Sequence, residues 1–206
     1  GGGQVLASPD GAIWTTETSS VTDSFLNDVL FADGRFLIAG ADPNTFLSST
    51  DGVHWTGAAG VGDWAEGVAF GNSTFVAVGR EGKIQTSADG QQWRPQVSGT
   101  TVRLKSVAFG NGAFVAAGDK GTVLTSPDGT TWTAQPPPPL RNITAVAFLN
   151  ERFFAVDEGA AILVSTDGAA WDVTRTTAQT GLNVIAAGPD RYVAVGGRGT
   201  IVTSPD

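Results

Sequence analysis

The chain has 206 residues, enough for one substantial core, and it has no cysteine, which excludes disulfides and thiolate metal sites. Its formal net charge of −8 disfavours nucleic acids and anionic membrane surfaces as partners. No apolar run approaches the ~18 residues needed to span a bilayer, so we expect one domain over residues 1–206 without membrane insertion.

The first predicted strand, residues 3–10, ends in a motif that returns along the whole chain, Ser-x-Asp-Gly-x-x-Trp. Successive motif aspartates are separated by 41, 38, 39, 39 and 39 residues. A period near 40 residues with strand-like content predicts the blades of a β-propeller. The five repeats cover about 11–51, 52–89, 90–128, 129–167 and 168–206.

Each repeat then predicts four strands in chain order, and the third repeat shows them most clearly. Residues 104–109 alternate with period two, and Gly110-Asn111-Gly112 predicts a tight hairpin turn into a second strand at 114–118. A third strand at 122–126 and a fourth at 130–133 follow, separated by the Asp-Gly turn. Gly118 ends the second strand; Asp157 replaces this glycine in the fourth repeat, and aspartate, like glycine, tolerates a left-handed backbone.

The last predicted strand, 199–206, duplicates the first, so the chain holds six third strands but five of each other kind. We expect an all-β fold, a five-bladed propeller with four antiparallel strands per blade. In this interpretation the N- and C-terminal strands complete one shared blade.

The constant residues of the motif have a structural explanation. A single sheet cannot bury both faces, so the tryptophans are expected to fill gaps between blades. The aspartates are expected to accept backbone hydrogen bonds in their own turns. One carboxylate per blade leaves the five far apart, so we expect no metal and no cofactor. These structural residues are Asp10, Trp14, Asp51, Trp55, Asp89, Trp93, Asp128, Trp132, Asp167 and Trp171.

The repeats resemble those of the Asp-box (BNR-repeat) β-propellers, a group that includes sialidases and the photosystem II assembly-factor type. The nearer likeness is to exported bacterial propellers with the pattern VAFGNGxFVAVGxxGxIxTSxDGxxW, which residues 68–93 and 107–132 follow. The motif departs from the usual box because Asp and Gly are adjacent. The resemblance implies a structural box and a secreted, periplasmic or cell-surface location. Sialidase activity does not carry over, since the only tyrosine, Tyr192, replaces a core phenylalanine.

The repeats differ most on one face, where second-to-third strand turns meet the links between blades. Loops on a rigid scaffold usually carry specificity, so this face is the predicted binding site. Trp64 could anchor a ligand there or cover its own blade. The candidate ligand-binding residues are Asp63, Trp64, Arg80, Glu81, Asp119, Lys120, Asp157, Glu158 and Arg198.

Three functions fit this pattern. The first is a non-enzymatic, monomeric scaffold that binds a protein or peptide on the variable face. The second is a lectin-type propeller that binds a glycan, and the third is a repeat-amplified or designed propeller without a specific ligand. A lectin should repeat polar pocket residues in each blade, whereas here the exposed residues vary, which favours the first hypothesis.

Overall fold

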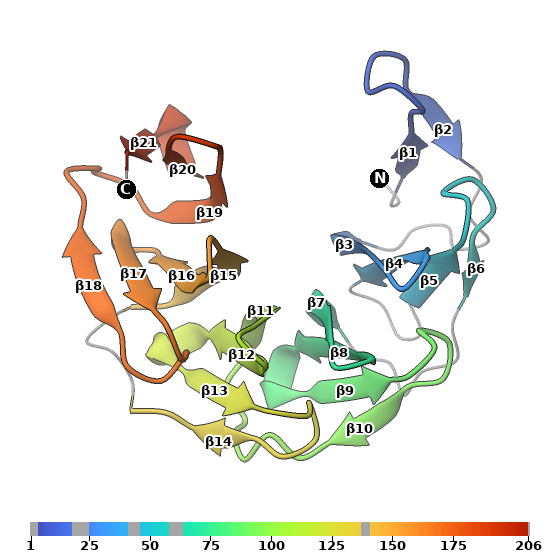
Figure 1. The fold of residues 1–206 in the computed structure, drawn as a ribbon, viewed down its shortest axis with the longest axis horizontal. Helices are drawn as coiled ribbons and strands as arrows, with labels where there is room; N and C mark the ends of the chain where they lie inside the picture. The colour runs from blue at the N-terminus through green and yellow to red at the C-terminus, as the bar shows by residue number, and fades with distance from the viewer. Residues whose placement is uncertain (1–3, 18–24, 41–45, 58–63, 137–140, 206) are drawn as a thin grey trace.

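The structure is a computed structural model that describes residues 4–17, 25–40, 46–57, 64–136 and 141–205. These residues form six antiparallel sheets, which lie side by side around one axis as an open ring (Figure 1). Four of the sheets have four strands, one has three and one has two. The predicted all-β propeller fold is confirmed. In the described part of the chain, no helix has the length and apolar character needed to cross a membrane.

The sheets follow one another along the chain. The first has β1 (Val5–Ala7) and β2 (Thr15–Glu17), and the second has β3 (Leu26–Ala32), β4 (Arg35–Gly40), β5 (Phe46–Ser49) and β6 (Thr56–Gly57). The third has β7 (Ala65–Gly71), β8 (Thr74–Gly79), β9 (Ile84–Ser87) and β10 (Arg94–Gln96). The fourth has β11 (Leu104–Gly110), β12 (Ala113–Gly118), β13 (Val123–Ser126) and β14 (Thr133–Ala134). The fifth has β15 (Ile143–Leu149), β16 (Arg152–Asp157), β17 (Ala161–Ser165) and β18 (Asp172–Arg175), and the sixth has β19 (Leu182–Ala187), β20 (Tyr192–Gly196) and β21 (Ile201–Ser204).

The register of the strands is the same in every repeat. Asn111 and Gly112 both have positive φ, 47° and 76°, and make the hairpin turn predicted between β11 and β12. The motif serine always lies opposite the aromatic residue that begins the second strand. These pairs are Phe36–Ser49, Phe75–Ser87, Phe114–Ser126, Phe153–Ser165 and Tyr192–Ser204.

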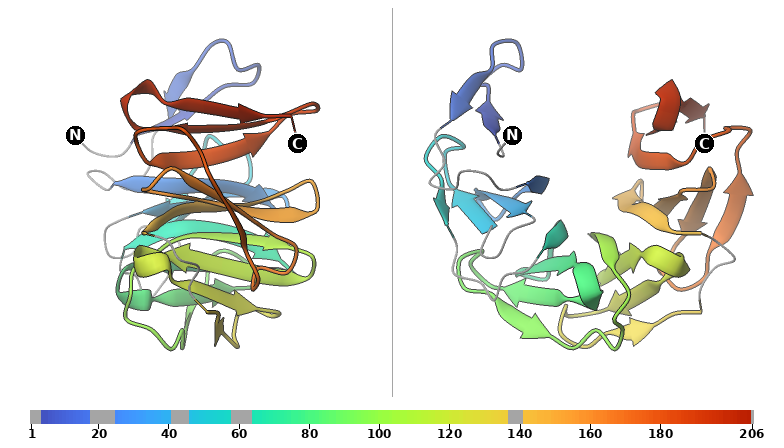
Figure 2. Two further views of the ribbon diagram at one scale, coloured as in Figure 1. Left: turned by 90° about the vertical axis from the view of Figure 1, so that its left-hand side faces the viewer. Right: turned by 180° about the vertical axis from the view of Figure 1, so that it is seen from behind.

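The predicted sharing of one blade by the two ends of the chain is wrong. β1 pairs with β2 and β21 pairs with β20, in two sheets on opposite sides of the gap in the ring (Figure 2). The reason is that β1 and β21 are both third strands, each leading into Ser-Pro-Asp, and would need the same position in a shared blade. The five-blade count is therefore not confirmed, because the described residues form six sheets.

The core lies between neighbouring sheets. In one interface, Leu37, Ala39 and Phe46 of the second sheet pack against Val68, Phe75 and Trp93 of the third. The Trp93 ring stacks on Phe46 with ring centroids 4.2 Å apart and an interplanar angle of 14°. Equivalent clusters lie between the third and fourth, fourth and fifth, and fifth and sixth sheets. Each sheet thus depends on its neighbours to bury its apolar faces.

The motif turns are closed by their own serine and aspartate side chains. In the fourth sheet, Asp128 Oδ1 accepts hydrogen bonds from the backbone N–H groups of Thr130 and Thr131, both at 2.8 Å. Ser126 Oγ accepts from Gly129 N at 2.8 Å, and the indole Nε1 of Trp132 donates to Gly129 O at 2.8 Å. The same aspartate bonds recur at Asp10, Asp51, Asp89 and Asp167.

Because these hydrogen bonds favour the ionised carboxylates, the folded protein is expected to lose stability in acid. The amides of Thr131 and Thr130 lower the pKa of Asp128 to about 2 from its ordinary value of 3.8, and the other four motif aspartates are shifted in the same direction. A carboxylate whose pKa is lowered by folding stabilises the protein above its unfolded pKa, and this contribution is lost as the pH falls through the folded pKa. We therefore expect the melting temperature to fall steeply between about pH 4 and pH 2.

The variant Asp128→Asn isolates one of these carboxylates. It keeps an oxygen acceptor but loses the charge, so we expect a loss of about 1 kcal/mol in the free energy of unfolding at pH 7. Denaturant unfolding at pH 7 and below pH 2 measures the effect, and the difference from the wild type should disappear in acid. A difference that persists below pH 2 would contradict the assignment to the charged carboxylate.

Candidate functional site

A ring of polar side chains surrounds the axis of the propeller, where the innermost strands meet. Each innermost strand has a register shift at its second residue, which leaves that residue without a partner in the ladder. Such a β-bulge turns the side chain of the extra residue away from the regular alternation. The five bulge residues line a cavity of about 370 Å³; they are Asn27, Glu66, Lys105, Thr144 and Asn183.

Some of the residues in these bulges join neighbouring sheets. Asn27 Nδ2 donates to Ala65 O at 2.8 Å, and Thr144 Oγ1 donates to Leu182 O at 2.5 Å. Asp28, the residue after the first bulge, accepts from Val68 N at 2.9 Å, and burial raises its pKa against the effect of this bond. These polar contacts hold the innermost strands in place around the cavity.

Glu66 and Lys105 instead belong to a network of charges at the mouth of the cavity. Arg103 donates two hydrogen bonds to the Glu66 carboxylate, from Nε to Oε1 at 3.1 Å and from Nη2 to Oε2 at 2.7 Å. These bonds raise the pKa of Arg103. Arg80 Nε lies 3.4 Å from the same carboxylate, and the Arg80 guanidinium stacks 3.9 Å from the centroid of Trp64. Two cations and one carboxylate therefore form a group with excess positive charge.

The neighbouring group of charges, around Lys105, carries an excess of negative charge. Lys105 Nζ lies 2.9 Å from Asp119 Oδ1 and 2.9 Å from Glu158 Oε1. Burial lowers the pKa of Lys105, but the hydrogen bonds to both carboxylates outweigh it and the pKa is raised overall. Lys105 and Asn142, in turn, lower the pKa of Glu158. One cation and two carboxylates thus give this group excess negative charge, one sheet further along the ring.

The turns that carry these charges are fixed by close backbone contacts. Asp119 N donates to Arg103 O at 3.0 Å, which ties a second-to-third strand turn to the link entering its own sheet. A Cβ on Gly118 would lie 2.0 Å from Arg103 O, and Gly118 has an extended backbone with φ of −173°. The expectation of a left-handed backbone at this position is therefore wrong. Glycine is required here because the turn and the link at Arg103 approach each other too closely for a Cβ. Asp157, at the equivalent position, does not have positive φ either.

The structure brings many of the predicted site residues together on this face. Trp64, Arg80, Asp119 and Glu158 belong to the charge network, and Lys120 N donates to Asn142 Oδ1 at 2.9 Å beside it. Glu81 is exposed at its turn, where its nearest ionic partner is Lys83 at 3.9 Å.

Three predicted residues stand apart from the network. Asp157 is buried and accepts hydrogen bonds from Gly159 N and Ala161 N, so it holds its own turn. Arg198 is exposed on the turn of the sixth sheet, and Asp63 lies outside the described residues.

Sequence reasoning missed Glu66, Arg103, Lys105 and Asn142. The available signal was variation at one position, the second residue of each first strand, which reads Asn, Glu, Lys, Thr and Asn in the five repeats. Within the part of the chain that the structure describes, no three His, Cys, Asp or Glu residues are placed to hold a metal ion.

Comparisons with known proteins agree with the fold. A family model described as the DUF6242 beta propeller domain matches residues 98–206. No curated protein matches the chain in sequence. A structure of YCF48 bound to D1 peptide is similar with a TM-score of 0.71 and 20% identity, covering 95% of this chain and 69% of that chain. YCF48 from Cyanidioschyzon merolae gives a TM-score of 0.71 and 21% identity, covering 98% and 74%. A catalytically inactive virginiamycin B lyase from Staphylococcus aureus, with quinupristin, gives 0.83 and 11%, covering 98% and 77%. At these identities the likeness shows the fold alone.

Proposed function

The chain belongs to the DUF6242 β-propeller domain family, and on that premise we propose that it is a non-enzymatic interaction propeller. Its ligand is an extended segment of a protein or peptide, bound across the mouth of the axial cavity. The ligand segment carries one acidic and one basic side chain, which meet the two charge groups described above.

The observation that carries this proposal is the divergence of the bulge residues. The apolar and motif residues that hold the sheets together recur from repeat to repeat, whereas the five bulge residues around the cavity are two asparagines, one threonine, one glutamate and one lysine, and only two of the five carry a charge. A repeated glycan site needs the same polar groups in each blade, whereas a single asymmetric polypeptide is matched by a ring whose members differ. The YCF48 structure with a bound peptide supports a polypeptide ligand on a related fold.

The two charge groups define the chemistry of the ligand. The group of Glu66, Arg80 and Arg103 has one cation in excess, so it attracts a ligand carboxylate. The group of Lys105, Asp119 and Glu158 has one carboxylate in excess, so it attracts a ligand lysine or arginine. Arg80 and Glu158 are the more exposed members of their groups and are the residues that a ligand reaches first.

A displayed library of random peptides tests this proposal directly. We expect selected peptides to be enriched in sequences with one acidic and one basic residue. The variants Arg80→Gln and Glu158→Gln each neutralise one group, and each is expected to weaken peptide binding about tenfold. The matched control is Arg152→Gln, an exposed cation at the start of β16, next to the first-to-second strand turn on the opposite face, and it should leave binding unchanged.

A second change, made in the peptide, tests whether its acidic residue pairs with Arg80. Replacing this residue by its amide should not weaken the binding of the peptide to Arg80→Gln any further, because that variant has already lost the ion pair between Arg80 and the peptide carboxylate. Selected peptides that bind equally well to both variants, or that lose affinity only with Arg152→Gln, would place the binding site elsewhere. A glycan array run in parallel distinguishes the lectin hypothesis.

A further inference from the structure

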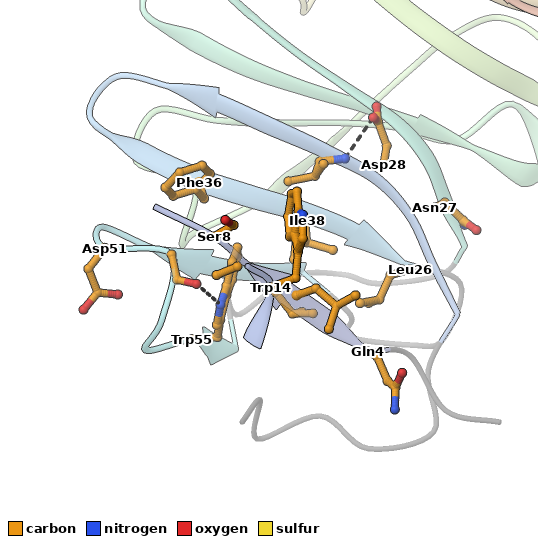
Figure 3. A pocket seen from close by; sticks show the side chains of 15 residues that line it. Gln4, Ser8, Trp14, Leu26, Asn27, Asp28, Phe36, Ile38, Asp51 and Trp55 are labelled. Carbon is orange, nitrogen blue, oxygen red and sulfur yellow. Dashed lines mark hydrogen bonds between the residues drawn. The ribbon is translucent and has the colours of Figure 1, made fainter. Parts of the chain in front are cut away.

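Trp64 differs from the tryptophans of the repeated motif in what its ring contacts. Trp55 shows the motif arrangement: its ring is buried, and its indole Nε1 donates to Gly52 O of its own turn at 3.0 Å (Figure 3). Four of the five motif tryptophans belong to the apolar clusters of the described residues, whereas none of these clusters includes Trp64. Cover of its own blade therefore does not account for Trp64, whose ring instead contacts the Arg80 guanidinium.

The backbone of Trp64 is left-handed, with φ of 56°, which is a strained conformation for a bulky side chain. The same position, just before the first strand, holds Arg103, Asn142 and Gly181 in the next three repeats, and none of these has positive φ. At all four positions the carbonyl accepts a hydrogen bond from the residue that follows the second strand, at 3.0–3.3 Å. The fold therefore does not require positive φ here, since even the glycine does not adopt it.

The ring of Trp64 restricts an arginine that is otherwise held loosely. The Arg80 guanidinium lies 3.9 Å from the ring centroid, and its side chain is 47% exposed. Among the described residues, the ionic contact of Arg80 is a single long one, 3.4 Å from Nε to Glu66 Oε1. Arg103 makes two shorter bonds to the same carboxylate. Arg80 therefore depends on the stacked ring for a fixed orientation, whereas Arg103 does not.

We infer that Trp64 is a positioning residue, which orders Arg80 for the carboxylate of the ligand. This inference rests on the proposed function, in which Arg80 meets an acidic side chain at the cavity mouth. A free arginine side chain loses rotamer entropy when a ligand fixes it, and this loss weakens binding. Stacking on Trp64 removes that freedom beforehand. It uses the flat face of the guanidinium and leaves the N–H donors at its edge available to a carboxylate.

The mobility of Arg80 tests this inference in the absence of any ligand. NMR relaxation of the Arg80 Nε–H group should show restricted motion in the wild type and in Trp64→Phe, which keeps an aromatic face. In Trp64→Asn, which lacks that face, the same group should become mobile on the picosecond-to-nanosecond timescale. Arg103 is the internal reference, because its two bonds to Glu66 should keep it ordered in all three proteins.

The same variants separate peptide affinity from stability. The probe is the tightest-binding peptide that the wild type selects from the displayed library. We expect Trp64→Asn to weaken its binding about fivefold, and Trp64→Phe to retain most of the affinity. Asparagine tolerates positive φ better than phenylalanine does, so Trp64→Asn should melt no lower than Trp64→Phe. The control Trp14→Asn changes an exposed tryptophan that does not line the axial cavity and should leave the affinity unchanged.

A double variant shows whether Trp64 acts through Arg80. In the Arg80→Gln background, Trp64→Asn should have no further effect on peptide affinity. The inference is overturned if Arg80 stays ordered in Trp64→Asn. It is also overturned if the peptide binds Trp64→Asn as tightly as the wild type while Arg80→Gln weakens binding. If Arg80→Gln itself binds with wild-type affinity, the proposed function fails at this site, and the inference fails with it.

Discussion

Replacement of Trp93 by alanine is expected to destabilise the protein by about 3–5 kcal/mol. Trp93 is 5% exposed, and its ring stacks on Phe46 of the neighbouring sheet. Truncation removes this contact and leaves a cavity in the interface between the second and third sheets. Denaturant unfolding measures the loss, which should appear as a lower midpoint with an unchanged dependence on denaturant concentration.

Two comparisons identify the cause of this loss. Trp93→Phe keeps an aromatic ring against Phe46 and removes a buried indole N–H that has no hydrogen-bond partner among the described residues. Its loss in the free energy of unfolding should therefore be much smaller than that of the alanine variant. Trp14 occupies the same motif position in the first sheet but is 58% exposed, so Trp14→Ala should cost below about 1 kcal/mol. Equal losses at Trp14 and Trp93 would mean that the first sheet is covered in solution as the others are.

This contrast between equivalent tryptophans also shows what the sequence can and cannot predict. The strands, the hairpin turns and the Asp-Gly turns were predictable because each depends on neighbouring residues, such as the positive φ of Asn111 and Gly112. Closure of the ring depends instead on the small rotation between successive sheets, and this rotation cannot be predicted from a sequence motif of neighbouring residues. The Ser-Pro-Asp sequence that both terminal repeats share, at 8–10 and at 204–206, made one shared blade plausible, although two third strands cannot fill one position.

The candidate site was predictable only in part for a related reason. Arg80, Asp119 and Glu158 belong to turns that vary between repeats, and turns can be recognised from their glycines and polar residues. Lys105 lies in a strand whose alternation is regular in the sequence, and only the pairing with β12 reveals the bulge that turns it toward the cavity. A bulge is a property of two strands, so the sequence of one strand does not display it.

The second large effect is expected at Gly118, where alanine should destabilise the protein by about 2–3 kcal/mol. Alanine tolerates the extended φ of −173°, so the loss arises from the contact of the new Cβ with Arg103 O, a backbone atom that cannot rotate away. The turn and the link must separate, which weakens the hydrogen bond from Asp119 N to Arg103 O. Because Asp119 and Arg103 belong to the two charge groups, the variant should also weaken the proposed binding of a peptide at the cavity mouth.

Gly57 provides the matched control for this substitution. It also lies in a strand without positive φ. Apart from its chain neighbours, no heavy atom of the described residues lies within 4 Å of a Cβ added there, so Gly57→Ala should change stability by less than about 0.5 kcal/mol. Asp157 shows how a side chain can be accommodated at the position of Gly118, since its turn adopts a different conformation in which Ala160 has the positive φ. If Gly118→Ala were as stable as Gly57→Ala, the fourth sheet would have to adopt the turn of the fifth. The hydrogen-exchange protection of Asp119 and Lys120 amides would then reveal that rearrangement.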